Sequence, residues 1–197
     1  MTPFTIAVAA TKGGVGKTTT AVALAEILSA PATPAMLVDT DPQGSASRWC
    51  TWSAAAGTPA SWNLTHHLPD DGSPDRWVVI DTPTGVVDQI DAAVSVADVV
   101  VIPTTPSPMD LVRVKPTADL AGAVGTPALV LLTMVPTRSA DVPLAFEVLE
   151  AFGVPVATTV IPHRARWRRA YGTRIPADLL ETYRPLVAEL AAIARKG

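Results

Sequence analysis

The stretch T-K-G-G-V-G-K-T-T-T, residues Thr11–Thr20, decides the fold because it lies between an apolar run at Phe4–Ala10 and an alanine- and leucine-rich segment at Thr18–Ala30. It has the character of a phosphate-binding loop that joins a buried strand to a helix. Its three glycines let the backbone turn tightly and bring successive N–H groups onto a phosphate. The helix N-terminus that follows adds unpaired donors and a positive dipole end. The stretch therefore predicts a nucleoside triphosphate site.

Each polar side chain of this loop has an expected role. Lys17 can reach the β- and γ-phosphates, and the Thr18 hydroxyl can coordinate Mg²⁺. Contacts to the nucleotide are expected along the whole loop, at Gly13, Gly14, Val15, Gly16, Lys17, Thr18 and Thr19. The alternative is a glycine-rich turn between a strand and a helix whose lysines serve no ligand.

Composition limits the class of protein. A chain of 197 residues is expected to form one domain, and 48% hydrophobic residues with a mean hydropathy of +0.30 favour a buried α/β core over disorder. No apolar run approaches the ~20 residues that cross a bilayer, and we expect no secretory signal at the N-terminus. The single cysteine, Cys50, is typical of a reducing compartment. These features predict a soluble cytoplasmic domain.

Apolar runs alternate with helical segments along the chain. Strands are predicted at Phe4–Ala10, Met36–Asp41, Trp77–Asp81, Val99–Thr104, Ala128–Val135 and Val154–Ile161. Helices are predicted at Thr18–Ala30, Gly44–Ala56, Gly85–Ala97, Pro106–Val124, Ala140–Phe152 and Pro176–Ala194, and Pro116 should kink or restart its helix. This alternation predicts an α/β fold, a mostly parallel twisted sheet with helices on both faces and the ligand at the carboxyl ends of the strands.

One stretch, Gly57–Arg76, is polar, contains proline and shows little periodicity. Its adjacent histidines, His66 and His67, suggest a metal site, but neighbouring residues point in different directions and no third ligand is apparent nearby. A surface loop or a short strand is the favoured interpretation.

Aspartates stand at the ends of two predicted strands. Asp81 follows four apolar residues, which is where a carboxylate can hold Mg²⁺ through water, although an aspartate here can also cap a turn. Asp39 and Asp41 lie two residues apart and so project to the same side. For one of these two, the alternative role is an N-cap of the helix predicted at Gly44.

Taken together, these motifs resemble the ParA/MinD family of deviant Walker A ATPases, with a P-loop NTPase fold. The loop K-G-G-V-G-K-T-T carries the family's extra lysine at Lys12, and Asp39–Gly44 is similar to its D-x-D-P-Q-G segment. Further matches are D-T-P at Asp81, P-x-T-P-S-P-x-D ending at Asp110, and I-P-x-R ending at Arg164. The resemblance is strongest to the small, ParF-like plasmid-partition type, a single ATPase domain over residues 1–197 without an N-terminal helix-turn-helix extension.

The resemblance assigns roles to particular residues. Lys12 would reach across a dimer interface to the partner's nucleotide, and Lys12, Lys17 and Asp41 would be catalytic. Asp41 would align the attacking water; with Thr18 and Asp81 it forms the expected magnesium site, and Asp39 would support the metal indirectly. Asp110 would lie on the nucleotide-dependent dimer face, and Pro162 near the base.

Two positions depart from the family pattern. Thr84 replaces the usual second proline of the D-T-P-P segment. Thr133 stands where relatives commonly place a base-reading asparagine, which leaves adenine recognition open but not triphosphate binding.

Arginines gather near the C-terminus of a chain whose net charge is −3. No acidic residue falls between Ala151 and Ala177, whereas five arginines do: Arg164, Arg166, Arg168, Arg169 and Arg174. Trp167 and Tyr171 are four apart, so they are expected to pack inward while the arginines point out. We expect DNA phosphate contacts from Arg166, Arg168, Arg169 and Arg174, whereas Arg164 lies close to the predicted base site. The alternative is a solvated arginine surface.

Two functions follow from the resemblance. The first is a partition ATPase that uses ATP and Mg²⁺, dimerises with ATP, binds DNA nonspecifically on the nucleoid and is reset when a centromere-binding, ParB-like partner stimulates slow hydrolysis. The second is a MinD-like positioning ATPase that associates with a membrane. The segment Ala188–Gly197 has no apolar stripe to spare for an anchor, which favours the first. The cargo could be a plasmid, a chromosome or a protein assembly.

Overall fold

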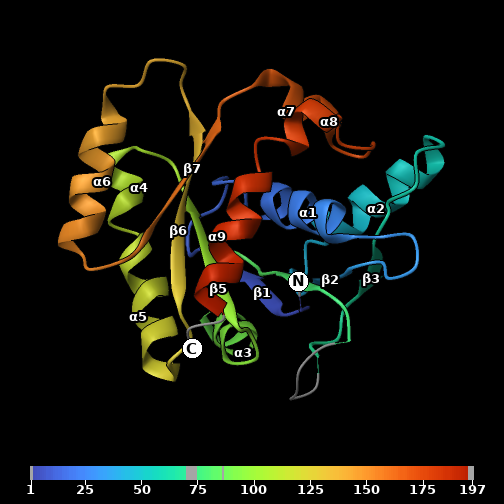
Figure 1. Ribbon diagram of the computed structural model, residues 1–197, viewed down its shortest axis with the longest axis horizontal. Helices are drawn as coiled ribbons and strands as arrows, with labels where there is room; N and C mark the ends of the chain where they lie inside the picture. The colour runs from blue at the N-terminus through green and yellow to red at the C-terminus, as the bar shows by residue number, and fades with distance from the viewer. Residues whose placement is uncertain (1, 70–74, 86, 195–197) are drawn as a thin grey trace.

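A seven-stranded parallel sheet forms the centre of a computed structural model that describes residues 2–69, 75–85 and 87–194. The order of the strands is β3-β2-β4-β1-β5-β6-β7 (Figure 1). Their bounds are β1 Thr5–Val8, β2 Met36–Asp39, β3 Asn63–Thr65, β4 Val78–Asp81, β5 Val99–Thr104, β6 Ala128–Val135 and β7 Val156–Pro162. Every pairing between these strands is parallel, which confirms the predicted fold class.

Helices cover both faces of the sheet, which explains why its strands are apolar on both sides. Successive residues of β1 therefore point into different hydrophobic cores. Ile6 belongs to the core on the face covered by α1 (Lys17–Leu28) and α9 (Arg184–Ala194). Ala7 belongs to the core on the opposite face, which α3 (Val87–Ser95) and α5 (Val114–Val124) cover. The other helices are α2 Ser45–Ala55, α4 Pro108–Leu111, α6 Asp141–Ala151, α7 Ala165–Ala170 and α8 Ala177–Leu180.

Two predicted helices are each divided in two. The helix predicted at Pro106–Val124 breaks between α4 and α5, and Pro116 becomes the third residue of α5. The helix predicted at Pro176–Ala194 breaks between α8 and α9, and Pro185 becomes the second residue of α9. A proline is accommodated in the first turn because the N–H groups there need no partner within the helix. The prediction of one unbroken helix at Pro176–Ala194 was therefore wrong, whereas the restart expected near Pro116 is observed, with the new helix beginning at Val114.

The stretch Gly57–Arg76 contains a strand that the sequence left open. Strand β3 pairs in parallel with β2 at the edge of the sheet. His66 follows it directly, and its Nδ1 lies 2.9 Å from the carbonyl oxygen of Asp39. Among the described residues no three His, Cys, Asp or Glu side chains come together to hold a metal ion. Part of this stretch, residues 70–74, lies outside the description.

The helices of the described residues are all too short or too polar to cross a bilayer. The final cations of the sequence, Arg195 and Lys196, lie outside those residues.

The register of the sheet brings the expected site together. Asp39 and Asp81 are paired positions on the neighbouring strands β2 and β4, and Val8, at the end of β1, pairs with Asp81. The loop Thr11–Thr20 follows β1, so it lies at the same carboxyl edge of the sheet as both aspartates.

Candidate nucleotide-binding site

The loop between β1 and α1 has the backbone that an anion site needs. Gly14 and Gly16 have φ values of 77° and 90°, in the left-handed region that side chains disfavour. Gly16 precedes the first residue of α1, and its carbonyl accepts a hydrogen bond from the N–H of Thr20 at 2.9 Å. The N–H groups of the first turn therefore remain available to a phosphate, as predicted.

Lys17 is the central cation of this loop. Its side chain is buried, and its Nζ donates to the carbonyl oxygen of Lys12 at 2.9 Å and to the Thr84 hydroxyl at 2.8 Å. Burial lowers the pKa of Lys17, while the nearby carboxylates of Asp81 and Asp41 act in the opposite direction. The amine thus lies between the loop and the end of β4, beside the carboxylates.

Asp81 is a buried carboxylate whose burial is only partly compensated by its neighbours. It is fully buried, and neither carboxylate oxygen has a hydrogen-bond partner among the described residues. Burial raises the pKa of Asp81 to about 7; the nearby Thr18 hydroxyl and Lys17 charge oppose this rise, and Asp39 and Asp41 add to it. A buried carboxyl that is costly to ionise and sits beside a threonine hydroxyl fits a magnesium ion, which prefers oxygen ligands and keeps several waters.

Asp39 and Asp41 have different surroundings: one is hydrogen-bonded to the start of a helix, and the other lies near the nucleotide site. Asp39 is buried and accepts hydrogen bonds from the N–H and hydroxyl of Ser47, at 2.8 and 2.6 Å, so it caps the start of α2. The carboxylate of Asp41 accepts a hydrogen bond from the N–H of Gln43 at 2.9 Å. Its influence on the pKa values of Lys17 and Asp81 places it within electrostatic reach of both. Asp41 therefore remains the candidate for positioning water.

Lys12 already has an ionic partner within its own chain. Its Nζ pairs with Asp110, whose other oxygen accepts a hydrogen bond from the Thr105 hydroxyl at 2.6 Å. Although burial raises the pKa of Asp110, the hydrogen bonds from Lys12 and Thr105 keep it below its ordinary value. Sequence analysis gave Lys12 only a role across a dimer interface; the fold also gives it a partner within its own chain, because α4 lies against the loop.

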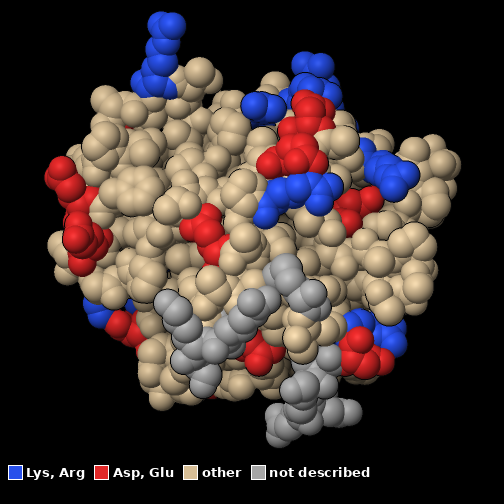
Figure 2. Space-filling model, viewed as in Figure 1, with Lys and Arg blue, Asp and Glu red and all other residues tan. Residues whose placement is uncertain are grey.

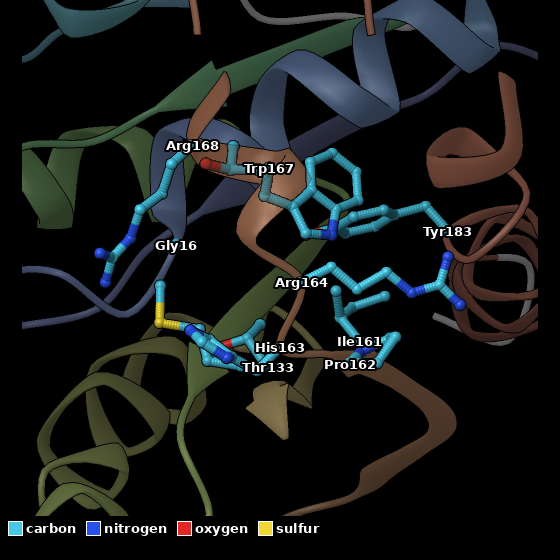
Figure 3. A pocket seen from close by; sticks show the side chains of 11 residues that line it. Gly16, Thr133, Ile161, Pro162, His163, Arg164, Trp167, Arg168 and Tyr183 are labelled. Atoms are coloured by element: carbon cyan, nitrogen blue, oxygen red, sulfur yellow. The ribbon is translucent and has the colours of Figure 1, made fainter. Parts of the chain in front are cut away.

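An apolar pocket opens beside the start of α1 (Figure 3). Its lining includes Gly16, Thr19, Pro162, Trp167 and Tyr183. The Trp167 and Tyr183 rings meet edge to face, with centroids 5.4 Å apart. An apolar pocket next to a phosphate loop suits a nucleotide base, and Pro162, expected near the base, is one of its lining residues.

Thr133 also lies on this pocket, but its hydroxyl is directed at the backbone. The oxygen is 2.8 Å from the carbonyl of Val15 and 3.1 Å from that of Thr104, so its single proton is engaged there. Thr133 therefore ties the phosphate loop to the sheet. Sequence reasoning did not single out Tyr183 as a pocket residue, because it fits the apolar stripe of a helix equally well.

The arginine cluster is less uniform than its sequence suggests. Arg166 forms an ion pair with Asp178 at 2.5 Å, and Arg174 one with Glu26 at 3.4 Å. Figure 2 shows acidic side chains among the cations that gather over α7 and α8. Within the described part of the chain Arg168 and Arg169 form no ion pair, and Arg168 borders the base pocket on the side opposite to Arg164 (Figure 3).

The aromatic residues of this segment do pack inward, as predicted. They contact different neighbours, however, because Tyr171 lies just beyond the end of α7. Its ring packs edge to face against Trp49 and Trp52 of α2, whereas Trp167 packs on Tyr183.

Comparison with known proteins places this site in a family. Residues 6–177 match the family described as the CobQ/CobB/MinD/ParA nucleotide binding domain. A relative from Gloeobacter kilaueensis is named Maintenance of carboxysome distribution protein A; it is 42% identical over 144 residues, which cover 70% of this chain and 66% of the relative, just under two thirds of its length. A protein of the same name from Halothiobacillus neapolitanus is 32% identical over 184 residues, covering 85% of this chain and 83% of that protein.

The fold also matches solved structures. One is described as a plasmid partition protein from Borrelia burgdorferi B31 bound to AMPPNP. It has a TM-score of 0.75 and 17% sequence identity, over 96% of this chain and 98% of that one, which is a similarity of fold.

Proposed function

Because the chain belongs to the CobQ/CobB/MinD/ParA family of nucleotide-binding domains, we propose that it binds Mg·ATP at the loop Thr11–Thr20 and hydrolyses it slowly. The observation that carries this proposal is the arrangement of Asp81, Lys17 and Thr18. A buried carboxylate, which has no hydrogen-bond partner among residues 2–69, 75–85 and 87–194, lies near a buried cation and the start of a helix. A magnesium ion and a triphosphate together would satisfy all three groups.

The residues present can divide the work of hydrolysis. Phosphoryl transfer needs neutralised phosphate charge and a positioned water, and little covalent chemistry from the protein. Lys17 would neutralise charge on the β- and γ-phosphates, and Thr18 and Asp81 would hold Mg²⁺, the latter through water. Asp41 would orient the attacking water. Bound magnesium supplies further neutralisation of the phosphate oxygens.

Removal of the Lys17 cation tests the proposal. Lys17→Ala should weaken binding of a fluorescent ATP analogue at least tenfold, because hydrogen bonds to charged groups are lost, and hydrolysis should fall to background. Lys115→Ala is the matched control, since Lys115 is an exposed lysine of α5 paired with Asp119. Equal binding of the analogue by wild type and Lys17→Ala would show that the site is misassigned.

We further propose that the chain is a positioning ATPase whose cargo is a large protein assembly. The names of the two relatives support this cargo more than a plasmid. The partner that stimulates hydrolysis would then mark the assembly, in place of the centromere-binding, ParB-like protein expected from the partition resemblance. Deletion of the gene should cluster the assemblies in cells; evenly spaced assemblies together with plasmid loss would favour partition instead.

A positioning ATPase needs a dimer and a surface to move on. We propose an ATP-dependent homodimer in which Lys12 exchanges Asp110 for the partner's nucleotide, and nonspecific DNA as the surface. Arg169 and Arg168 are the best candidates for phosphate contact, because Arg166 and Arg174 are already paired with acidic side chains. The membrane-associated alternative has no comparable support.

A further inference from the structure

A threonine hydroxyl, that of Thr84, lies over the phosphate loop, at the position where the family resemblance implied a proline. Thr84 follows Asp81 by three residues, in the loop after β4. Its Cγ2 is 3.5 Å from the position that a Cβ on Gly13 would take, so the side chain rests on the loop. Its Oγ1 accepts a hydrogen bond from Lys17 Nζ at 2.8 Å.

This hydroxyl still has a proton to donate. Among the described residues, the hydrogen bonds of Thr84 include the one accepted from Lys17 and none that the hydroxyl donates. The Thr84 side chain is also exposed at the mouth of the site. A threonine oxygen can accept one bond while its proton goes to another acceptor, whereas a proline side chain can do neither.

The direction of the nucleotide places Thr84 at the terminal phosphate. The base pocket is lined by Gly16 and Thr19, at the helix end of the loop. Thr84 lies against Gly13, at the opposite end, and beside the amine of Lys17. A triphosphate that starts from the pocket and runs along the loop therefore ends near Thr84, and Lys17 is the residue that spans its last two phosphates.

We propose that the Thr84 hydroxyl donates a hydrogen bond to the γ-phosphate while it continues to accept one from Lys17, so that the site distinguishes ATP from ADP through this residue. The inference rests on the proposed nucleotide site and adds a ligand for the phosphate that hydrolysis removes. After hydrolysis the hydroxyl loses its acceptor, whereas the contacts of ADP with the loop, Lys17 and the apolar pocket remain.

The test compares two nucleotides in three proteins. Titrations with a nonhydrolysable ATP analogue and with ADP, both with Mg²⁺, are made on wild type, Thr84→Val and Thr84→Ser. Valine keeps the branched shape without the hydroxyl, and serine keeps the hydroxyl without the methyl group. Thr84→Val should weaken binding of the ATP analogue about tenfold or more, because the hydrogen bond to its charged γ-phosphate is lost. ADP has no γ-phosphate, so its affinity should change less than about twofold.

The ratio of the two affinities separates this role from a structural one. A loop that is merely distorted would lose affinity for both nucleotides, whereas Thr84→Ser should retain the ratio of wild type. Thermal unfolding without nucleotide checks that each variant is folded. An unchanged ratio in Thr84→Val, or an equal loss in Thr84→Ser, overturns the role of Thr84 and leaves the nucleotide site standing. If wild type binds neither nucleotide, the proposed function fails and this inference fails with it.

Discussion

The change Asp81→Asn should stabilise the nucleotide-free protein by an amount that grows with pH. The pKa of this carboxyl is about 7 in the folded protein and 3.8 as its ordinary value, so between these values the folded state binds more protons than the unfolded chain. Its contribution to the free energy of unfolding therefore falls as pH rises from about 4 to about 7, and stays low above that range. Asparagine does not titrate and avoids this loss.

The size of the effect follows from the difference between the two pKa values. About three pKa units correspond to about 4 kcal/mol, because one unit is 1.36 kcal/mol. Part of this loss is already present at pH 5, where the unfolded carboxyl is ionised. Between about pH 5 and about pH 8.5, the stability advantage of Asp81→Asn over wild type should increase by about 3 kcal/mol.

Urea unfolding followed by tryptophan fluorescence measures this advantage at the two pH values, without nucleotide or magnesium. Asp91→Asn is the control, because Asp91 is an exposed aspartate of α3. An advantage that stays within about 0.5 kcal/mol between the two pH values would refute the assignment of Asp81 as an unpaired buried carboxyl. Addition of Mg·ATP should reverse the order of stability, since ligand that binds the folded state stabilises wild type more than the variant.

Two further sets of changes test the dimer and the DNA surface. Asp110→Asn releases Lys12 from its ion pair, so ATP-dependent dimerisation, measured by light scattering, should occur at severalfold lower protein concentration. Lys12→Ala should bind ATP without dimerising. A weaker dimer in Asp110→Asn would contradict the proposed exchange of Asp110 for the partner's nucleotide. Arg169→Glu combined with Arg168→Glu should weaken binding to random-sequence DNA at least tenfold and reduce its salt dependence, relative to the same charge change at Lys115. Wild-type protein with ATP that pellets with anionic liposomes and ignores DNA would favour the membrane-associated alternative.

Local patterns in the sequence predicted the phosphate loop and most of the sheet. Gly14, Gly16 and Lys17 act within a few residues of one another, so their spacing alone predicts the turn and the helix start. The strands were visible because burial on both faces requires continuous apolar runs. Strand β3 was not distinguished from a loop, because it has three residues, lies at the edge of the sheet and is only partly buried.

Contacts between distant segments could not be predicted in the same way. Lys12 and Asp110 are 98 residues apart, and their ion pair depends on how α4 packs beside the loop. The pairing of Arg174 with Glu26 likewise joins the end of the arginine segment to α1. An arginine segment without acidic residues in its own sequence can still be neutralised from elsewhere, which is why charge counts overstate the surface available to DNA.

Within the described residues, the two lysines of the candidate site have hydrogen-bond acceptors, whereas the carboxylate oxygens of Asp81 have no donor. Lys12 is paired with Asp110 and must exchange this carboxylate for a phosphate oxygen. Lys17 must exchange the Lys12 carbonyl, whereas its hydrogen bond to the Thr84 hydroxyl can remain. Asp81 has no hydrogen-bond partner to exchange in the part of the chain that the structure describes, and phosphates alone would bring further negative charge toward it. Magnesium removes that repulsion by lying between carboxylate and phosphate. Nucleotide and metal should therefore bind together, with each raising the affinity of the other by the same factor, as linkage requires.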